Sequence, residues 1–479
     1  MAIPKEILSV ERPKGTIVKH SGKKYYVIKR TSRYDKGRRV PVELGIVGEI
    51  INGAYVPKKD KMEKGVSDVK DYGNVVITDH FGREIYRDLL EVFNSDDAMK
   101  IYLYALLQSV YGDITARDMK LHYETSFASE LYPGVPCSRQ TIGSFLDLLG
   151  RHLNKINEFM KNRLKNIDKN APVIVDGMLK GNNSETNSFS AFSRKGKVKG
   201  SKDISLLYAI DYQKGEPLAS AVYPGNMLDQ TAFQDFAGHF SLDRGVLIGD
   251  KGFVLNDEMR KSIALKSNLK YLIPIKRNLK EIDKLHLLDF DAVIKSKEAV
   301  ILCRKSSVNN RFYYSFKNVQ TTGKEAHGFL QKNCARKTID TAALIKKYQK
   351  QENSFGTIVF ESNLDFTPEE IYKMYEHRWD IEEVFRFYKN ILEIDSVGVQ
   401  QDTRLYGEEF INFLSTIITC RMRNHFDRQE LFNDYSFRQI MLHLSKIKKV
   451  RSELTENQWC DSKHVSYIDK IIEKIAIDI

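Results

Sequence analysis

The feature that most constrains the fold is the order of apolar runs and helical stretches between residues 170 and 276. VIV, VLIG and YLIPI are short and wholly apolar, as expected of strands buried on both faces of a sheet. ISLLYAIDY and PLASAVYPG flank the turn YQKGE and predict a hairpin, while DQTAFQDFAGHF and NDEMRKSIALKSN predict helices. The order of three strands, a helix, a strand, a helix and a strand predicts a mixed sheet covered by helices.

Two of these apolar runs are predicted to end in a carboxylate. Asp176 ends VIVD and Asp250 ends LIGD, and α/β sheets expose their ligand sites where strands end. The competing interpretation is a turn or capping Asp before a glycine, which is common in proteins.

The stretch IYKMYEHRWDIEEVFRFYKN, residues 371–390, contains no Gly or Pro and predicts one helix. At about 100° per residue, Arg378, Glu382 and Lys389 fall within about 60° of Tyr375, in a stripe beside the apolar face. The competing interpretation is a surface ion pair between Arg378 and Glu382. With the two Asp residues, Glu382 completes three hard oxygen ligands, a set that suits Mg²⁺.

These motifs resemble those of the DDE transposases of bacterial insertion sequences, in the subgroup with the signature Y-x2-R-x3-E-x6-K. YEHRWDIEEVFRFYK matches all four signature positions, VIVDG and LIGDKGF match the two Asp motifs, and YPGNMLDQTAF resembles another element of the group. The resemblance covers about residues 170–426. It implies an α/β fold with a ribonuclease-H-like mixed sheet that is interrupted by a β-rich insertion.

The resemblance also implies roles for individual residues. Asp176, Asp250 and Glu382 would be catalytic and would hold two Mg²⁺ ions, for which Mn²⁺ can substitute. The other signature residues would contact DNA: Tyr375 and Arg378 the phosphates beside the cut, and Lys389 the terminal element DNA. The implied activity is cut-and-paste transposition through a hairpin, by a homodimer that joins the freed 3′-OH to target DNA.

Two further features are predicted to contact DNA. Trp379 lies at the edge of the stripe and either stacks on an unpaired base at the cut end or packs in the core. The loop AFSRKGKVKGSKD is basic and follows the first Asp motif, so contact with backbone phosphates competes with a merely solvated face. Its basic residues are Arg194, Lys195, Lys197, Lys199 and Lys202.

The chain divides into six predicted segments. They are a small β-rich module with candidate DNA contacts (1–95), a helical DNA-binding region (96–165), two parts of the catalytic domain (166–276 and 366–426), the β-rich insertion between them (277–365) and a helical C-terminal tail (427–479). Ser138 followed by Arg139 and Gln140 predicts the start of a helix that either reads DNA or packs against the core.

The charge and cysteine pattern constrain the setting. A formal net charge of +12 and a pI of about 9.1 favour a polyanionic partner, double-stranded DNA first. Neither a secretion leader nor a membrane span is predicted, and five dispersed cysteines fit a reducing bacterial cytoplasm, with the protein at the nucleoid. The competing functions are another ribonuclease-H-like metal-dependent DNA nuclease and an inactive DNA-binding relic.

Overall fold

The computed structural model divides the chain into two compact units. The smaller comprises Met1–Val69 and Val450–Asp461, and the larger comprises Lys70–Lys449 and Ser462–Ile479. The structure describes residues 3–22, 24–35, 38–57, 66–112, 114–167, 172–192, 201–227, 229–240, 244–249, 260, 268–295, 299–334, 340–376, 384–394, 396–452, 455–463 and 465–477. Within these ranges, no helix is both long enough and apolar enough to cross a bilayer.

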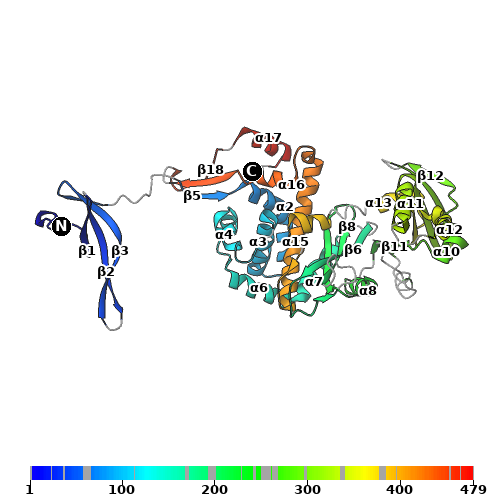
Figure 1. Ribbon diagram of the computed structural model, residues 1–479, viewed down its shortest axis with the longest axis horizontal. Coiled ribbons are helices and arrows are strands. Elements are labelled where there is room, and N and C mark those ends of the chain that lie inside the picture. Colours follow the sequence, from blue (N-terminus) through cyan, green and yellow to red (C-terminus); the bar gives the residue numbers. More distant parts are fainter. Residues whose placement is uncertain are drawn as a thin grey trace. The chain divides into compact units, whose positions relative to one another are not determined.

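The smaller unit contains the predicted antiparallel module. Its strands, in sheet order, are β1 (Thr16–Ser21), β2 (Lys24–Asp35), β3 (Arg38–Ile51) and β4 (Ala54–Pro57), preceded by the short helix α1 (Lys5–Leu8) (Figure 1). All three strand pairings are antiparallel. Its core is small and centres on Val18, Val27 and Ile50.

Helices from both ends of the larger unit form one bundle. They are α2 (Gly73–Leu90), α3 (Ser95–Tyr111), α4 (Met119–Thr125), α5 (Ala128–Leu131), α6 (Arg139–Arg151), α7 (Leu153–Lys165) and α15 (Asp402–Arg428). The predicted cap at Ser138 is confirmed, because its side chain accepts a hydrogen bond from the Thr141 N–H. The cap of α3 is Asn94, whose side chain accepts a hydrogen bond from the Asp97 N–H.

Helix α15 is buried along its middle, although polar residues are spread through its sequence. Every residue from Phe410 to Cys420 is buried, because α2, α3 and α6 pack around it (Figure 1). Two glycines allow α6 and α15 to touch backbone to backbone. A Cβ at Gly150 would lie 1.6 Å from the Thr403 carbonyl oxygen, and one at Gly407 would lie 2.1 Å from that of Leu146.

The larger unit is built on the predicted mixed sheet. Its central strands, in spatial order, are β9 (Pro217–Pro224), β8 (Lys202–Asp211), β6 (Pro172–Asn182), β10 (Arg244–Ile248) and β11 (Asn268–Ile275). β8 and β9 run antiparallel to their neighbours, while β10 is parallel to both β6 and β11. The helix α8 (Asp229–His239) joins β9 to β10. This arrangement confirms the predicted α/β class with a ribonuclease-H-like sheet.

The strands that follow β11 extend this same sheet. They are β12 (Ala292–Lys295), β13 (Val300–Val308), β14 (Arg311–Asn318) and β15 (Thr357–Ser362), and β15 pairs with β11. The helices α10 (Lys280–Lys284), α11 (Val319–Cys334) and α12 (Thr341–Gln351) lie between them in the chain. The strands of the insertion are therefore hydrogen-bonded into the same sheet as β6, β10 and β11.

The C-terminal region contains strands as well as helices. Its elements are α16 (Phe437–Leu444), β17 (Lys448–Ser452), β18 (Cys460–Asp461) and α17 (Ser466–Ile475). The two strands form a small sheet with β5 (Val66–Asp71), in the order β18-β17-β5. The tail is thus joined to a strand from the N-terminal part of the chain.

Candidate active site

Asp176 lies in the middle of β6, so the prediction that this strand ends at Asp176 was wrong. β6 continues because β8 pairs with it from Val173 to Gly181. On the other side, β10 pairs only with residues 172–174, and β16 (Ser396–Val397) pairs only with residues 181–182. For residues 175–180 no strand partner is described on that side. Asp176 therefore lies just beyond the last described pairing with β10.

The surroundings of Asp176 are polar on one side and tightly packed on the other. The carboxylate is half-buried, and its Oδ1 accepts a hydrogen bond from the Gly177 N–H at 2.8 Å. Tyr208 lies opposite Asp176 across the β6–β8 pair. Burial, and then the charge of Glu409, raises the pKa of Tyr208 far above its ordinary value, so the phenol is neutral. Asp176 is thus held beside a fixed aromatic ring.

The second half of the signature stretch packs on the face of the sheet that carries Asp176. Residues paired directly across strands point to the same face, so Asp176 and Tyr208 share one. The Phe385 ring meets the Tyr208 ring edge-on, with centroids 5.8 Å apart. Val384 beside it is buried. The segment 384–394 therefore covers the Asp176 face over β8.

The first half of the stretch covers the same face farther along the sheet. The register runs from Ile174 through Ile248 and Leu272 to Ser362, and Phe360 lies two residues along β15 on that face. The Tyr375 ring packs on Phe360 with centroids 4.8 Å apart. Tyr375 belongs to α13 (Pro368–Glu376), so this helix lies over β15.

The start of α13 follows the predicted FTPEE signal. The Thr367 hydroxyl accepts a hydrogen bond from the Glu370 N–H at 3.3 Å, and the Glu370 carboxylate accepts one from the Thr367 N–H at 2.9 Å. This reciprocal cap fixes where the helix begins. The signature stretch is therefore anchored to the sheet from its first turn.

Lys389 does not lie on a regular α-helix. The segment Phe387–Ile391 is a π-helical turn, in which each residue rotates less than the 100° assumed for the predicted stripe. Arg438 of α16 donates a hydrogen bond to the carbonyl oxygen of Asn390 at 2.6 Å and so supports this turn. Lys389 itself is half-buried. The angle calculated between Tyr375 and Lys389 therefore does not apply.

Most of the other predicted site residues lie outside the described part of the chain. These are Asp250, Glu382, Arg378, Trp379, Arg194, Lys195, Lys197 and Lys199. The described residues that precede or follow them in the chain show where these segments are attached to the sheet. Gly249, which precedes Asp250, donates its N–H to the Leu272 carbonyl oxygen at 3.2 Å. The ends of the basic loop meet at the strand pair Phe192–Lys202, where β7 (Ala191–Phe192) begins to pair with β8.

A buried ion pair on the strand of Asp176 was missed from the sequence. The Lys180 Nζ lies 2.7 Å from Glu409 Oε1, and the two side chains are 1% and 5% exposed. Lys180 is four residues after Asp176, about 13 Å along β6, and points to the same face, so the pair links β6 to α15. The available signal was a lysine and two glutamates inside otherwise apolar segments, MLKGN and GEEFINFL.

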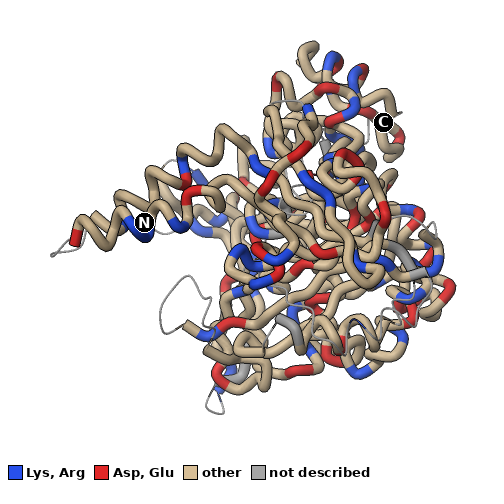
Figure 2. The backbone as a smooth tube through the Cα atoms, turned by 90° about the vertical axis from the view of Figure 1, so that its right-hand side faces the viewer, with Lys and Arg blue, Asp and Glu red and all other residues tan. Residues whose placement is uncertain are grey.

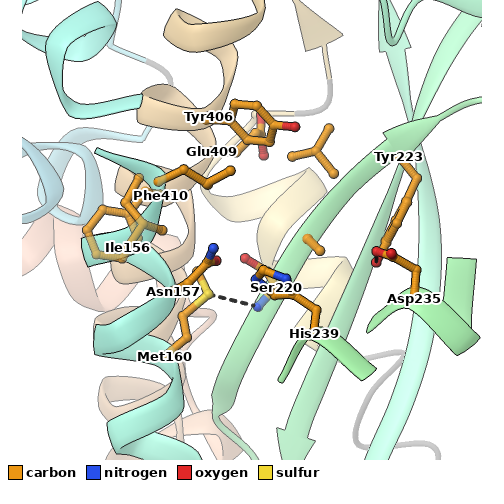
Figure 3. Close-up of a pocket in the computed structure, with 13 residues that line it drawn as sticks. Ile156, Asn157, Met160, Ser220, Tyr223, Asp235, His239, Tyr406, Glu409 and Phe410 are labelled. Atoms are coloured by element: carbon orange, nitrogen blue, oxygen red, sulfur yellow. Dashed lines mark hydrogen bonds between the residues drawn. The ribbon is translucent and has the colours of Figure 1, made fainter. Parts of the chain in front are cut away.

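A cavity of about 230 Å³ lies beside β9, two strands from Asp176 (Figure 3). The Ser220 N–H donates to Met160 Sδ at 3.4 Å across its floor. Its acids already have partners: Glu409 pairs with Lys180, and Asp235 accepts from the Tyr223 hydroxyl at 2.9 Å. Among described residues, no group of three or more His, Cys, Asp or Glu side chains is placed to hold a metal ion. The cavity is therefore not a second metal site.

Comparison with known proteins adds two findings. The family model described as "Transposase DDE domain" matches residues 173–416, just over half of the chain, from β6 into α15. A cryo-EM structure of a piggyBac transposase synaptic complex with hairpin DNA is similar over 88% of this chain and 87% of that chain, with 12% sequence identity and a TM-score of 0.40. No curated protein matches the chain.

Proposed function

Because this chain belongs to the DDE-domain transposases, we propose that it cuts the ends of an insertion sequence and joins each freed 3′-OH to target DNA. The proposed reaction is two-metal phosphoryl transfer in a cut-and-paste cycle with a hairpin at the element end. The observation that carries it is the packing of the signature stretch on the sheet face that holds Asp176, through Phe385 and Tyr375.

Asp176, Asp250 and Glu382 are the proposed ligands of two Mg²⁺ ions, with Mn²⁺ as a substitute. Asp250 directly follows Gly249, so the Cα atoms of this pair are about 3.8 Å apart. Glu382 precedes Phe385 by three residues, a span of at most about 11 Å, and the Phe385 ring touches the partner of Asp176 across the strand pair. Covalent reach alone thus allows all three carboxylates to meet at one edge of β6.

The donor set fits the metal. Asp176 is half-buried and lies just beyond the last described pairing of β6 with β10, and three carboxylates are the hard ligands that Mg²⁺ prefers. Bound there, the ions would activate the attacking oxygen and stabilise the leaving oxygen of an in-line displacement. The protein holds Asp176 through β8 and α15, which fixes the strand beneath the reacting phosphate.

The remaining proposed contacts are to DNA. Arg378 supplies a planar fork and Lys389 a point charge for phosphates, with Tyr375 beside the cut and Trp379 stacked on an unpaired base. Arg194, Lys195, Lys197 and Lys199 would hold the flanking backbone. The loop they form ends at Lys202, six residues or about 20 Å along β8 from the partner of Asp176. We propose that two copies pair two element ends at the bacterial nucleoid.

The test combines cleavage and joining. Purified protein is incubated with Mg²⁺ and duplexes from both flanks of its coding region, and nicked, hairpin and joined products are separated on denaturing gels. Asp176→Asn, Asp250→Asn and Glu382→Gln should each lower cleavage at least about a thousand-fold, because each removes a ligand of the reacting centre. Binding of the same duplexes without metal should persist.

Glu369→Gln is the matched control. Glu369 lies on α13 in an exposed ion pair with Lys373, and the substitution should leave cleavage unchanged. Cleavage that survives Glu382→Gln would refute its assignment as a ligand. Cleavage by the unmodified chain without any strand joining would indicate a nuclease, and no cleavage at either end would indicate a relic.

A further inference from the structure

The smaller unit carries a two-stranded ribbon within residues 30–43, described for 30–35 and 38–43, that runs past the rest of its sheet (Figure 1). β1 pairs with β2 only as far as Lys29, and β4 pairs with β3 only from Gly48 onward. At the base of the ribbon the Arg30 N–H still donates to the Gly15 carbonyl oxygen. From Thr31–Val42 to Asp35–Arg38, the strand pairing described is that of β2 with β3. Two register shifts, next to Ile28 and next to Arg30, separate the ribbon from the sheet at its base, and such bulges increase strand twist.

The ribbon side chains that the structure describes lie open to solvent on both faces. Arg30, Thr31, Ser32, Arg38, Arg39, Val40, Pro41 and Glu43 are exposed, and Val42 is half-buried. Those residues contribute nothing to the described core around Val27. A two-stranded ribbon with both faces exposed to solvent is only marginally stable alone. Its length therefore indicates a surface that binds a partner.

The charge of the ribbon identifies the class of partner. Residues 30–43 contain five basic residues and two acids, five minus two or a net +3. Glu43, at the other end, forms an ion pair with Lys19, with Lys19 Nζ 2.7 Å from Glu43 Oε2. In the larger unit, by contrast, Lys and Arg positions are interspersed with Asp and Glu along the backbone (Figure 2). A concentrated positive charge on a narrow ribbon complements a polyanion.

We propose that this ribbon enters the major groove of duplex DNA and supplies the contacts that hold the element end. The major groove, about 12 Å wide, admits a two-stranded β-ribbon. The register puts Arg30 and Arg39 on one face and Arg38 on the other. Arg39 is oriented by its Nε–H, which donates to Ser32 Oγ at 2.8 Å. A guanidinium fixed in this way can bind guanine O6 and N7 or a phosphate.

This inference rests on the proposed DNA substrate, but its test needs no cleavage. The full-length chain is titrated, without metal, into a duplex of about three helical turns taken from a flank of the coding region. Affinity is measured over a salt series, and protection of guanine N7, a major-groove atom, is mapped with dimethyl sulfate. The variant is Arg38→Gln/Arg39→Gln, and the matched control is Lys5→Gln/Lys14→Gln, which removes the same charge from exposed positions of the same unit.

The ribbon variant should bind about 10- to 100-fold more weakly, lower the log–log salt slope by about 2, and lose N7 protection at one block of bases. The control should change affinity by less than about threefold and keep the footprint. Equal affinity and footprint for the ribbon variant and the unmodified chain would overturn the proposal. An unchanged DNA affinity of the ribbon variant, combined with a lower molecular mass in light scattering without DNA, would also overturn the proposal. That result would show that the ribbon binds a second copy of this chain. A guanine N7 footprint from a chain that does not cleave DNA would support the ribbon proposal and refute only the proposed reaction.

Discussion

Two Lys–Glu ion pairs have the same length in opposite surroundings. Lys180 and Glu409, in the larger unit, are 2.7 Å apart and 1% and 5% exposed. Lys19 and Glu43, in the smaller unit, are also 2.7 Å apart but 52% and 41% exposed. Equal geometry here does not mean equal energy. A buried charge depends on its partner, whereas water and salt screen an exposed pair.

The difference extends from these pairs to the regions that contain them. The strand of Asp176 is held by β8, by α15 and by a buried ion pair. The ribbon has no such support, so its described side chains stay accessible to a partner. The variants below test this contrast between a buried, supported strand and an exposed ribbon, from the largest expected effect to the smallest.

Replacing the lysine of each ion pair should give the largest difference in unfolding free energy between the two regions. Lys180→Met strands the Glu409 charge in the interior and should cost about 3–5 kcal/mol of unfolding free energy, measured by denaturant titration. Lys180→Met/Glu409→Leu should recover most of that loss, because it removes both charges. Lys19→Met is the matched exposed control and should cost at most about 1 kcal/mol. Equal losses at the two sites would remove the contrast.

The second prediction concerns Glu216, a buried carboxylate of the larger unit whose contribution to stability depends on pH. Glu216 accepts hydrogen bonds from Arg421 and Arg163 at 2.7 and 2.9 Å. Burial alone would raise the pKa of Glu216, but these two guanidinium groups outweigh it and hold the pKa below its ordinary value of 4.5. A depressed folded pKa stabilises the native state above the ordinary pKa, and this contribution is lost as pH falls through the folded pKa.

Glu216→Gln should therefore destabilise the protein most at neutral pH. We expect a loss of about 2–3 kcal/mol, less than for an isolated buried pair, because Arg421 and Arg163 keep Glu84 and Asp88 as partners. As pH falls below the ordinary pKa of 4.5, the loss should shrink, because the unfolded carboxyl protonates first and the folded one follows at its lower pKa. Denaturant titrations at several pH values measure it. A loss that does not depend on pH would show that the Glu216 charge is not what stabilises this cluster.

Much of this architecture could be predicted because buried strands are locally apolar. VIV, VLIG and YLIPI identify β6, β10 and β11, and the hairpin turn identifies β8 and β9. The extent of β6 could not be predicted, because its second half, GMLKGN, interrupts the apolar run with glycines and a lysine. Lys180 is buried there through Glu409, which is 229 residues away in the sequence. Helix α2 was also missed. It starts at Gly73 after Tyr72, which makes no side-chain cap, so the sequence contains no start signal there.

The candidate site shows the same division. Its acids belong to local motifs that can be read from sequence, but their surroundings depend on distant packing. The mixed composition of α15 is typical of an amphipathic helix, yet α2, α3 and α6 together with strands of the sheet bury its polar residues. Similarly, the π-helical turn at Lys389 is supported by Arg438, a contact from a different helix that no helical wheel can anticipate.

Two buried acids on β8 offer a contrast within the larger unit. Asp203 is 7% exposed, and its Oδ2 has no hydrogen-bond partner in the described structure. Burial raises the pKa of Asp203 above its ordinary value of 3.8, so the ionised form costs stability that grows as pH rises through the folded pKa. Asp211 is 4% exposed, but it accepts N–H groups of Gln213 and Lys214 at 2.8 and 3.0 Å.

Asp203→Asn should therefore stabilise the protein by about 1 kcal/mol at pH 7, and Asp211→Asn should destabilise it by a similar amount. The gain at Asp203 should vanish below its ordinary pKa of 3.8, where the carboxyl is neutral in both states. Thermal melts at pH 7 and pH 3.5 test both variants. A loss at Asp203 on substitution would mean that its charge has a partner which stabilises it.

The smallest expected effect belongs to the ribbon side of the comparison. Leu44, at the base of the ribbon, is 63% exposed, while Leu414 of α15 is fully buried. Leu44→Ala should change unfolding free energy by less than about 0.5 kcal/mol, because it removes little buried area. Leu414→Ala should cost about 2–5 kcal/mol, because it leaves a cavity in close packing. If Leu44→Ala cost as much as Leu414→Ala, the ribbon would pack on protein in the free chain, and its surface would not be open to DNA.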